Sequence, residues 1–289
     1  MDQTTATPTL QNPLAKHFRQ PSIYLKLPSA GTHWPEGSID LPITGDIPIL
    51  PMSTKDEIVL KTPDALLNGQ GVVDVIQNCC PSIKDAWNMP SVDVDAVIIA
   101  IRIASYGNQM DFTSECPHCK TTNDYAVDLG IILSNITAPN YNTKLAVDDL
   151  KFKLKPQPYF SVNRSSMIAY EEQQILRSLG TLEDNPEEAK RIFNNNLTKL
   201  VDLNIQMLAD STDYIETADG SIVSDANFIQ EFYKNCDTKI VKAIRIKLDE
   251  HSLYGSIKPV NVVCQNEECA KEFDITITFD FASFFAKGS

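Results

Sequence analysis

The most regular hydrophobic pattern in the chain lies between residues 91 and 107. Apolar side chains recur there every three or four residues, which places them on one face of a helix. This face consists of Val94, Val97, Ile98 and Ile101, followed by Ser105. Ser91, Asp93 and Asp95 give the segment a polar start, and Gly107 gives it an end. The pattern therefore predicts a helix over this range.

Capping signals predict further helices. Residues 62–64, Thr-Pro-Asp, combine an N-cap, a proline at the first helical position and an acidic first turn, so a helix should follow to about Cys79. Other helices are predicted over residues 161–179 and from Asn185 onward. Asp225 is expected to cap one long helix. The apolar side of that helix is Ile229, Phe232, Tyr233, Cys236, Ile240, Ile244 and Leu248.

Alternating and β-branched residues predict the strands. They are residues 23–27, 58–60, 151–154, 260–263 and 273–279. Asp219-Gly220 lies between two short apolar runs and predicts a hairpin turn. From residue 22 to 52 the apolar runs are broken by proline and glycine, which favours loops and edge strands. The mixture indicates an α+β protein.

These elements divide the chain into four ranges. Residues 1–21 are rich in Thr and Pro and are expected to form an extended N-terminal arm. Residues 22–159 would hold the first part of a β-rich module, with two helices and a first cysteine pair. Residues 160–255 would be a helical insertion, and residues 256–289 would supply the last strands with a second cysteine pair. The two chain ends would therefore build one β-rich module.

Composition and charge narrow the classes of function. The chain is 43% hydrophobic and 22% charged, as in ordinary globular proteins, and its net charge is −13. Such a charge repels a phosphate backbone, so nucleic-acid binding is not expected. The most apolar stretch, residues 96–104, is far shorter than the roughly 20 residues that a membrane helix needs. Because the N-terminus does not resemble a signal peptide, we expect a cytoplasmic chain without a membrane anchor.

Two cysteine pairs carry the strongest chemical signal. Cys116 and Cys119 belong to a Cys-Pro-His-Cys sequence, and Cys264 and Cys269 are separated by four polar or acidic residues. Each pair can present two sulfurs from one tight turn, and four sulfurs satisfy a tetrahedral zinc ion. The sequence thus predicts a zinc-ribbon-like structural site assembled by tertiary folding. His118, between two of these ligands, is expected to be exposed.

Two other interpretations of the four cysteines stay open. Cys-Pro-His-Cys also occurs in thiol oxidoreductases, where the pair lies between a strand and a helix N-terminus. Alternatively, the four residues are free thiols, or disulfides of an assembled particle. The remaining cysteines, Cys79, Cys80 and Cys236, fit buried thiols that pack as small hydrophobes.

Signatures of catalysis are missing from the sequence. It contains no nucleophile elbow, no metalloprotease helix and no phosphate-binding glycine loop. The chain has four histidines. His17 and His251 are expected to be solvated, and His33 with Trp34 lies in a Pro/Gly-rich loop that suits packing or a partner. We therefore expect a protein that is not an enzyme.

Several short segments, in order, resemble one phage protein family. They are Pro21 to Gly31 with its Leu-Pro-Ser-x-Gly turn, residues 49–52, 56–58 and 61–69, residues 98–102 with Ser105-Tyr106-Gly107, both cysteine pairs, and Asp280-Phe281 with Phe284-Phe285. The chain resembles the T4-like baseplate proteins of contractile-tailed bacteriophages. The resemblance implies a subunit of the baseplate hub, or a chaperone used while the hub is built.

The sequence thus predicts a non-enzymatic structural protein of the phage baseplate, which binds other tail proteins in a symmetric assembly. It would be made in the host cytoplasm and remain in the virion tail. The alternatives are a transient hub assembly chaperone and, from another class, a thiol oxidoreductase. The expected contact surfaces are the arm and the segment 22–52. Within that segment the candidate partner-binding residues are Ile23, Tyr24, Leu27, Pro28, Gly31, His33 and Trp34.

Overall fold

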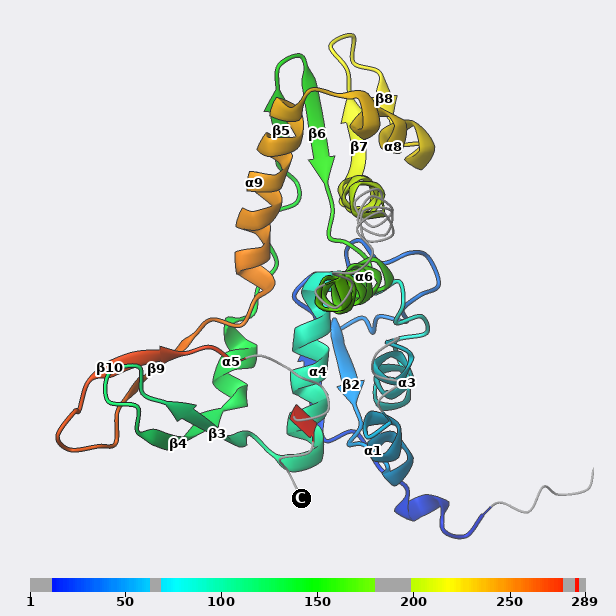
Figure 1. Cartoon of the computed structure of the whole chain (residues 1–289). Coiled ribbons are helices and arrows are strands. Elements are labelled where there is room, and N and C mark those ends of the chain that lie inside the picture. Colours follow the sequence, from blue (N-terminus) through cyan, green and yellow to red (C-terminus); the bar gives the residue numbers. More distant parts are fainter. Residues whose placement is uncertain (1–11, 63–68, 180–198, 278–283, 286–289) are drawn as a thin grey trace, which may run out of the picture.

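The protein has an α+β fold, as its sequence predicts (Figure 1). The computed structural model describes residues 12–62, 69–179, 199–277 and 284–285. Within these ranges the strands form three two-stranded sheets and one four-stranded sheet, all antiparallel. Helices, rather than one large sheet, therefore organise the cores.

Helix α4, Ser91–Tyr106, lies in the middle of the lower part of the molecule (Figure 1). It confirms the helix predicted over residues 91–107. Nearly every residue from Val92 to Arg102 is buried, with Asp95 the partly exposed member. A helix that is apolar on all sides is stable only where other elements cover each side.

Elements from both halves of the chain cover α4. Strand β1 (Ile23–Lys26) pairs with β2 (Asp46–Ile49), and the two strands bury Leu25, Ile47 and Ile49 in the same core. The core is completed by α1 (Thr54–Leu60), α3 (Gln70–Cys79), α5 (Leu129–Asn135) and the C-terminal Phe284 and Phe285. Phe284 is held by Arg102, whose Nε donates to the backbone carbonyl of Phe284 at 3.1 Å.

The Leu-Pro-Ser-x-Gly turn is fixed to α4 by a buried carboxylate. Asp93 is fully buried and accepts hydrogen bonds from the backbone N–H of Ser29 at 2.8 Å, from its hydroxyl at 2.5 Å and from Trp34 Nε1 at 2.9 Å. Gly31 has φ +78°, and a Cβ there would lie 2.6 Å from the Leu41 side chain. The serine and the glycine of this turn therefore have structural roles.

A second core lies above the first in Figure 1. It is built on the sheet β5-β6-β7-β8, whose strands are Lys144–Val147, Leu150–Leu154, Thr212–Glu216 and Ile222–Val223. Helices α8 (Ala226–Asn235) and α9 (Thr238–Gly255) pack on this sheet. The hairpin predicted at Asp219-Gly220 joins β7 to β8, which places two strands inside the range expected to be a helical insertion.

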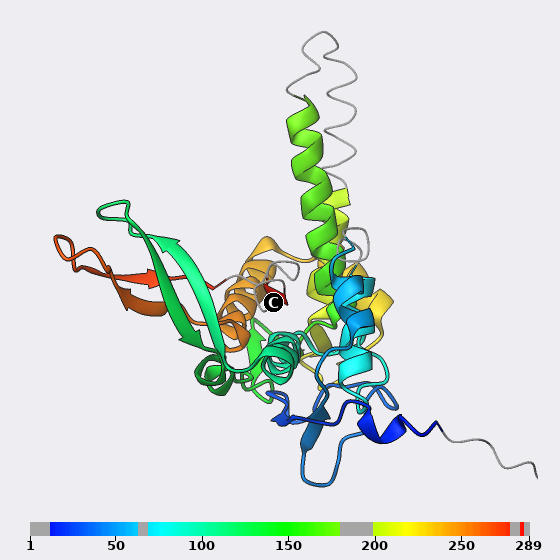
Figure 2. The ribbon, with the colours of Figure 1, turned by 90° about the horizontal axis from the view of Figure 1, so that it is seen from below.

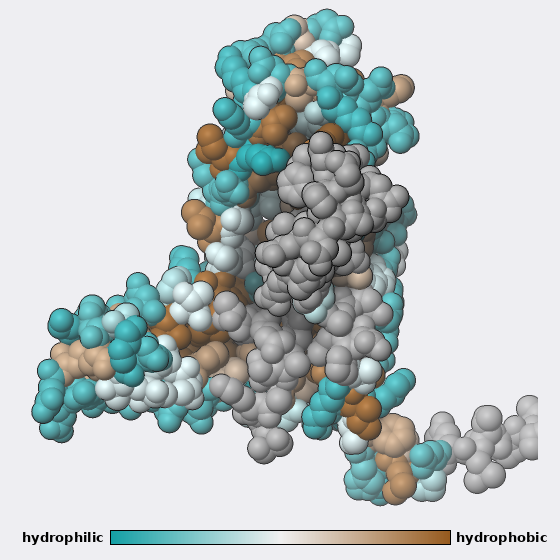
Figure 3. Space-filling view, viewed as in Figure 1, coloured by the Kyte–Doolittle hydropathy of each residue, from teal (hydrophilic) through white to brown (hydrophobic). Residues whose placement is uncertain are grey.

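Two long helices extend beyond the cores. Helix α6, Tyr159–Leu179, projects from the body (Figure 2). Helix α9 runs from the second core down to α4 and α5 (Figure 1). Along α9 some apolar side chains stay exposed, including Ile246 (62%) and Leu253 (67%), and apolar residues gather on this side of the surface (Figure 3). No helix among the described residues is long and apolar enough to cross a membrane.

Two hairpins project together from the body (Figure 1). Strands β3 (Gln109–Glu115) and β4 (Thr122–Asp128) form the first hairpin, and β9 (Val260–Val263) and β10 (Glu272–Ile275) form the second. Between them lies a small third core that includes Phe273, Ile275 and four cysteines. One hairpin comes from the first half of the chain and the other from its last part, so tertiary folding brings the two cysteine pairs together, as the sequence predicts.

Three predictions about local structure are wrong. Residues 58–60 are the end of helix α1, because Ser53 and Asp56 form a reciprocal capping box that starts a helix at Thr54. The long helix predicted after Asp225 is divided into α8 and α9, because Asp237 caps a new helix by accepting from Lys239 N–H. His251 is buried rather than solvated, since its ring packs edge-on against Tyr141. The helix starts expected at Thr62 and Asn185 fall at or within segments outside the described residues.

Replacing Asp93 by alanine should destabilise the fold. The change leaves the donors of Ser29 and Trp34 buried without an acceptor, and we expect a loss of about 3 kcal/mol in the free energy of unfolding. Urea denaturation followed by Trp fluorescence measures it. Asp111→Ala, on the exposed side of β3, serves as the control and should change stability little. Equal stability of the two variants would contradict the role assigned to Asp93.

Candidate metal centre

The first cysteine pair lies in the turn that joins β3 to β4. Seven residue pairs, from Gln109↔Asp128 to Glu115↔Thr122, hold the two strands in register up to this turn. The N–H of Cys116 donates to the carbonyl of Thr121 at 2.9 Å, and the N–H of Lys120 donates to the carbonyl of Cys116 at 2.9 Å. Lys120 takes a left-handed conformation (φ +64°), which turns the chain back just after Cys119.

The second pair repeats this geometry between β9 and β10. The N–H of Cys264 donates to the carbonyl of Lys271, and the N–H of Ala270 donates to the carbonyl of Asn266, both at 2.9 Å. Ala270, directly after Cys269, is left-handed (φ +43°), like its counterpart after Cys119. Both pairs are therefore knuckle turns in which the backbone aims two sulfurs to the same side.

The two turns bring all four sulfurs together. Cys116 Sγ lies 3.9 Å from Cys269 Sγ, Cys119 Sγ lies 3.6 Å from Cys264 Sγ, and all four sulfurs lie within 4.8 Å of one another. In a tetrahedral site with Zn–S bonds of about 2.3 Å, neighbouring sulfurs are about 3.8 Å apart. The spacing fits one tetrahedral metal ion bound by four thiolates. Among the described residues, these four form the one group of three or more side chains suited to hold a metal ion.

The surroundings shift the pKa of Cys119 and the pKa of Cys264 in opposite directions. Hydrogen bonds from the side chain and backbone of Thr121 lower the pKa of Cys119 to about 6, which favours the thiolate that a metal binds. Burial raises the pKa of Cys264 to about 11. A bound cation would favour deprotonation of all four thiols, so metal affinity should increase with pH.

Asn123 connects the two hairpins beside the sulfurs, a role that the sequence analysis missed. Its buried side chain accepts from Gln265 N–H at 2.9 Å and lies 3.8 Å from Cys264 Sγ through Nδ2. Tyr125 adds a second link, since its hydroxyl donates to the carbonyl of Val263 at 2.9 Å. In the sequence, Asn123 is an amide residue shortly after the first knuckle turn, and nothing in the sequence indicates that its side chain faces the second cysteine pair.

The first cysteine pair does not lie where the thioredoxin-type redox interpretation would place it. Cys116 and Cys119 connect two antiparallel strands, whereas a thioredoxin-type pair lies at the N-terminus of a helix. His118 is exposed, as expected. Cys79 and Cys80 are fully buried, and Cys236 is partly buried against the second core.

The structure distributes the candidate partner-binding residues between core and surface. Leu27 is buried (4% exposed) because it follows the inward alternation of β1, so it belongs to the core and we no longer propose it as a contact residue. Ile23 and Trp34 pack partly against the same core. Tyr24, a residue that is 68% exposed, and His33, whose ring packs edge-on against Tyr141, lie at the surface. The other two candidates, Pro28 and Gly31, are half-buried in the turn.

Comparison with known protein families shows which family the chain is related to. A family model described as T4 bacteriophage base plate protein matches residues 35–286. The chain belongs to this family. The match spans both cysteine pairs and most of the chain, and membership supports a structural role in the phage baseplate, with other tail proteins as partners. No curated protein and no solved structure matches the chain.

Metal analysis of the purified baseplate protein tests the four-cysteine site. We expect one zinc ion per chain by elemental mass spectrometry, and loss of the metal with a lower melting temperature in Cys119→Ser and Cys269→Ser. Each variant leaves three sulfurs, which no longer complete a tetrahedral site.

Cys236→Ser is the matched control, because this thiol lies outside the cluster. It should keep both the metal and the melting temperature. A metal-free wild-type protein whose stability does not change in Cys119→Ser or Cys269→Ser would contradict the site.

Proposed function

We propose that this protein is a permanent structural subunit of the hub region of a contractile-tail baseplate, that it is not an enzyme, and that a zinc ion bound by its four cysteines is structural. The family match over residues 35–286 carries the proposal. The subunit would assemble in the host cytoplasm and stay in the mature tail. Its candidate contact surfaces are the arm and the segment 22–52.

The base of the arm supports a role in contacting neighbours. Arg19 donates to Asp56 Oδ2 at 2.9 Å, to the carbonyl of Pro51 at 2.8 Å and to the carbonyl of Asn78 at 2.9 Å. Asp56 is almost fully buried (1% exposed side chain) and also caps α1. An arginine with three such acceptors fixes the position and direction in which the arm leaves the body.

Beyond this anchor, the arm presents apolar side chains to solvent. Leu14 (64%) and Phe18 (58%) are exposed on either side of the short helix η1, Ala15–His17, and the base of the arm carries apolar residues at the lower right of Figure 3. An isolated chain gains nothing from large apolar groups on a projecting segment. A neighbouring subunit that covers them would bury both side chains.

The charge of this region favours an acidic neighbour. Residues 1–27 contain three basic residues, Lys16, Arg19 and Lys26, and one acidic residue, Asp2. Their net charge is therefore +2, and the remaining residues carry −15, which together give the −13 of the whole chain. The arm itself, residues 1–21, carries +1, and its Arg19 is already paired with Asp56, so Lys16 is the basic side chain of the arm that can meet an acidic neighbouring surface.

A zinc ion at the four cysteines would support the same role by making the projecting hairpins stiff. Each hairpin has two strands, and an isolated two-stranded hairpin is only marginally stable in water. Four metal–sulfur bonds between the turns would hold the hairpins as one unit that extends from the body (Figure 1). A stiff projection keeps its surface residues in fixed positions, as a structural subunit requires.

Quantitative peptide mass spectrometry of purified virions distinguishes a subunit from a chaperone. We expect this chain in mature virions at a fixed ratio to the tail-tube and sheath proteins, because a structural subunit is retained. Infected-cell lysate serves as the reference. A chain found in lysate and lacking from virions would contradict the structural role and support a transient hub assembly chaperone.

A charge placed on the arm tests the contact directly. Phe18→Asp should leave the melting temperature of the free protein unchanged, because the side chain is exposed, and should reduce incorporation into virions about tenfold or more, because a buried charge opposes the interface. Ile222→Asp is the matched control, with 61% exposure on strand β8 at the far end of the molecule. Equal incorporation of Phe18→Asp and wild type would remove the arm from the contact surfaces.

A further inference from the structure

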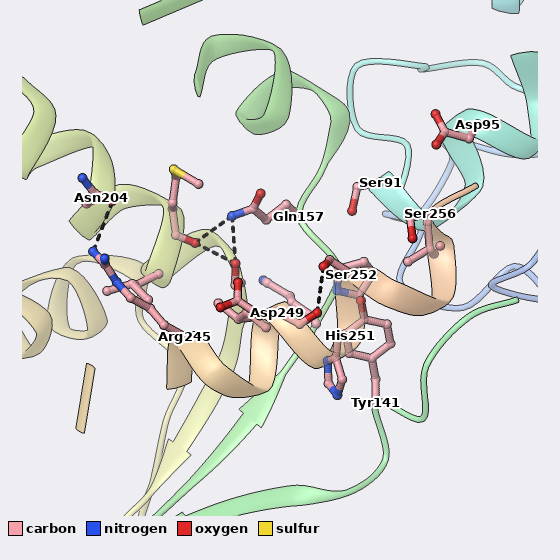
Figure 4. A pocket seen from close by; sticks show the side chains of 18 residues that line it. Ser91, Asp95, Tyr141, Gln157, Asn204, Arg245, Asp249, His251, Ser252 and Ser256 are labelled. Carbon is pink, nitrogen blue, oxygen red and sulfur yellow. Dashed lines mark hydrogen bonds between the residues drawn. The ribbon is translucent and has the colours of Figure 1, made fainter. Parts of the chain in front are cut away.

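A pocket lies where the two cores meet. Its volume is about 500 Å³, within the range that protein ligands occupy. It is lined by the start of α4, the segment after β6, the helical residues 204–208 and the C-terminal half of α9 (Figure 4). Neither the metal centre nor the proposed contact surfaces include these residues.

An unpaired carboxylate lies at one end of this pocket. Asp95 is partly buried on α4, and its carboxylate has no hydrogen bond or ion pair with any residue in the described part of the chain. Burial raises its pKa to about 6, so the group is mostly ionised at pH 7.5. Keeping an ionised carboxylate partly out of water without a partner costs stability. Asp93, two residues earlier, shows the contrast, because all its hydrogen bonds are made inside the protein.

His251, another residue of the lining, has a buried ring nitrogen without a partner among the described residues. His251 is 6% exposed, and its Nδ1 has no hydrogen bond to the described residues. Burial, followed by the charge of Lys247, lowers the pKa of His251, so the imidazole is neutral at pH 7.5. Its ring is held edge-on by Tyr141, with centroids 4.8 Å apart. When the proton is on Nε2, the bare Nδ1 accepts a hydrogen bond.

The pocket lining also contains basic side chains and a second carboxylate, and the basic Arg245 has a hydrogen-bond partner, unlike Asp95. Arg245 lies at the end opposite Asp95 in Figure 4, and its guanidinium donates to Asn204 Oδ1 at 3.2 Å. Lys155 and the exposed Asp249 complete the set of charged residues. The pocket therefore has a basic end that is already hydrogen-bonded and an end where a carboxylate has no partner.

We propose that this pocket binds a cationic group, the guanidinium of an arginine or the ammonium of a lysine on a neighbouring tail protein, with Asp95 as its ion-pair partner. The partner assignment rests on the proposed baseplate function. A divalent metal fits less well, because the described residues form no group of three or more metal-ligating side chains here.

Binding of small cations to the full-length protein tests the proposal. We expect N-acetylarginine amide, which imitates a partner side chain, to bind in titration calorimetry or ligand-observed NMR. Asp95→Asn should weaken this binding about tenfold or more, because it removes the charged acceptor. Asp249→Asn, an exposed carboxylate on the same pocket, is the matched control and should retain binding. No binding to the wild-type protein, or equal binding by Asp95→Asn, overturns the proposal.

A second probe distinguishes the source of the cation. Putrescine, a free diamine, carries ammonium groups without a peptide backbone. Stronger binding of N-acetylarginine amide supports a protein side chain. Stronger binding of putrescine overturns the assignment to a partner protein and indicates a free amine. Either result leaves the virion measurement unaffected, so failure here is separate from failure of the baseplate role.

The stability of the free protein gives an independent result. An acid whose folded pKa is raised destabilises the protein increasingly as pH rises from its unfolded value of about 4 toward its folded value. Asp95→Asn should therefore raise the melting temperature at pH 7.5 by roughly 2–4 °C and change it little at pH 4. A variant that is less stable at pH 7.5, or that does not fold, shows that the carboxylate has a structural partner, which overturns the proposal.

Discussion

The burial of helix α4 is the constraint on which the rest of the fold depends. Its apolar residues face in all directions, so no single partner element can cover them. The chain meets this need with β1, β2, α3, α5, α6, α9 and the C-terminal phenylalanines, which come from both ends and from the middle. The buried polar groups follow from the same constraint, since Asp93 and Arg102 lie on α4 and hold the segments that cover it. Covering α4 thus brings distant parts of the sequence together.

Features encoded by neighbouring residues were predictable from the sequence. The α4 range, strand β6, the β7–β8 hairpin and the meeting of the two cysteine pairs all follow from local periodicity, turn residues or the chemistry of sulfur ligands. The cysteine site was predictable because two cysteine pairs, each at the spacing of a tight turn, form a pattern typical of metal ligands. In each case the relevant information lies within a few residues, or in one repeated chemical type.

Other features depend on tertiary contacts or on capping choices that periodicity does not reveal. Residues 58–60 are β-branched or apolar and suit a strand, yet the capping box at Ser53 starts a helix at Thr54 that includes them. The helix break before Thr238 results from an aspartate that caps a new helix, although the apolar pattern continues across it. The burial of His251 and the acceptor role of Asn123 come from segments distant in sequence. Their partners can be named only when the fold is known.

The placement of the four cysteines also means that the site can close only after the chain has been synthesised through Cys269. The first two sulfurs leave the ribosome long before the last two, and neither hairpin alone supplies more than half of the ligands. A chain interrupted anywhere before Cys269 therefore lacks the closed site, even if α4 and the sheet β5-β6-β7-β8 have formed. A closing step that needs both hairpins would favour assembly of chains that have been synthesised through the second hairpin.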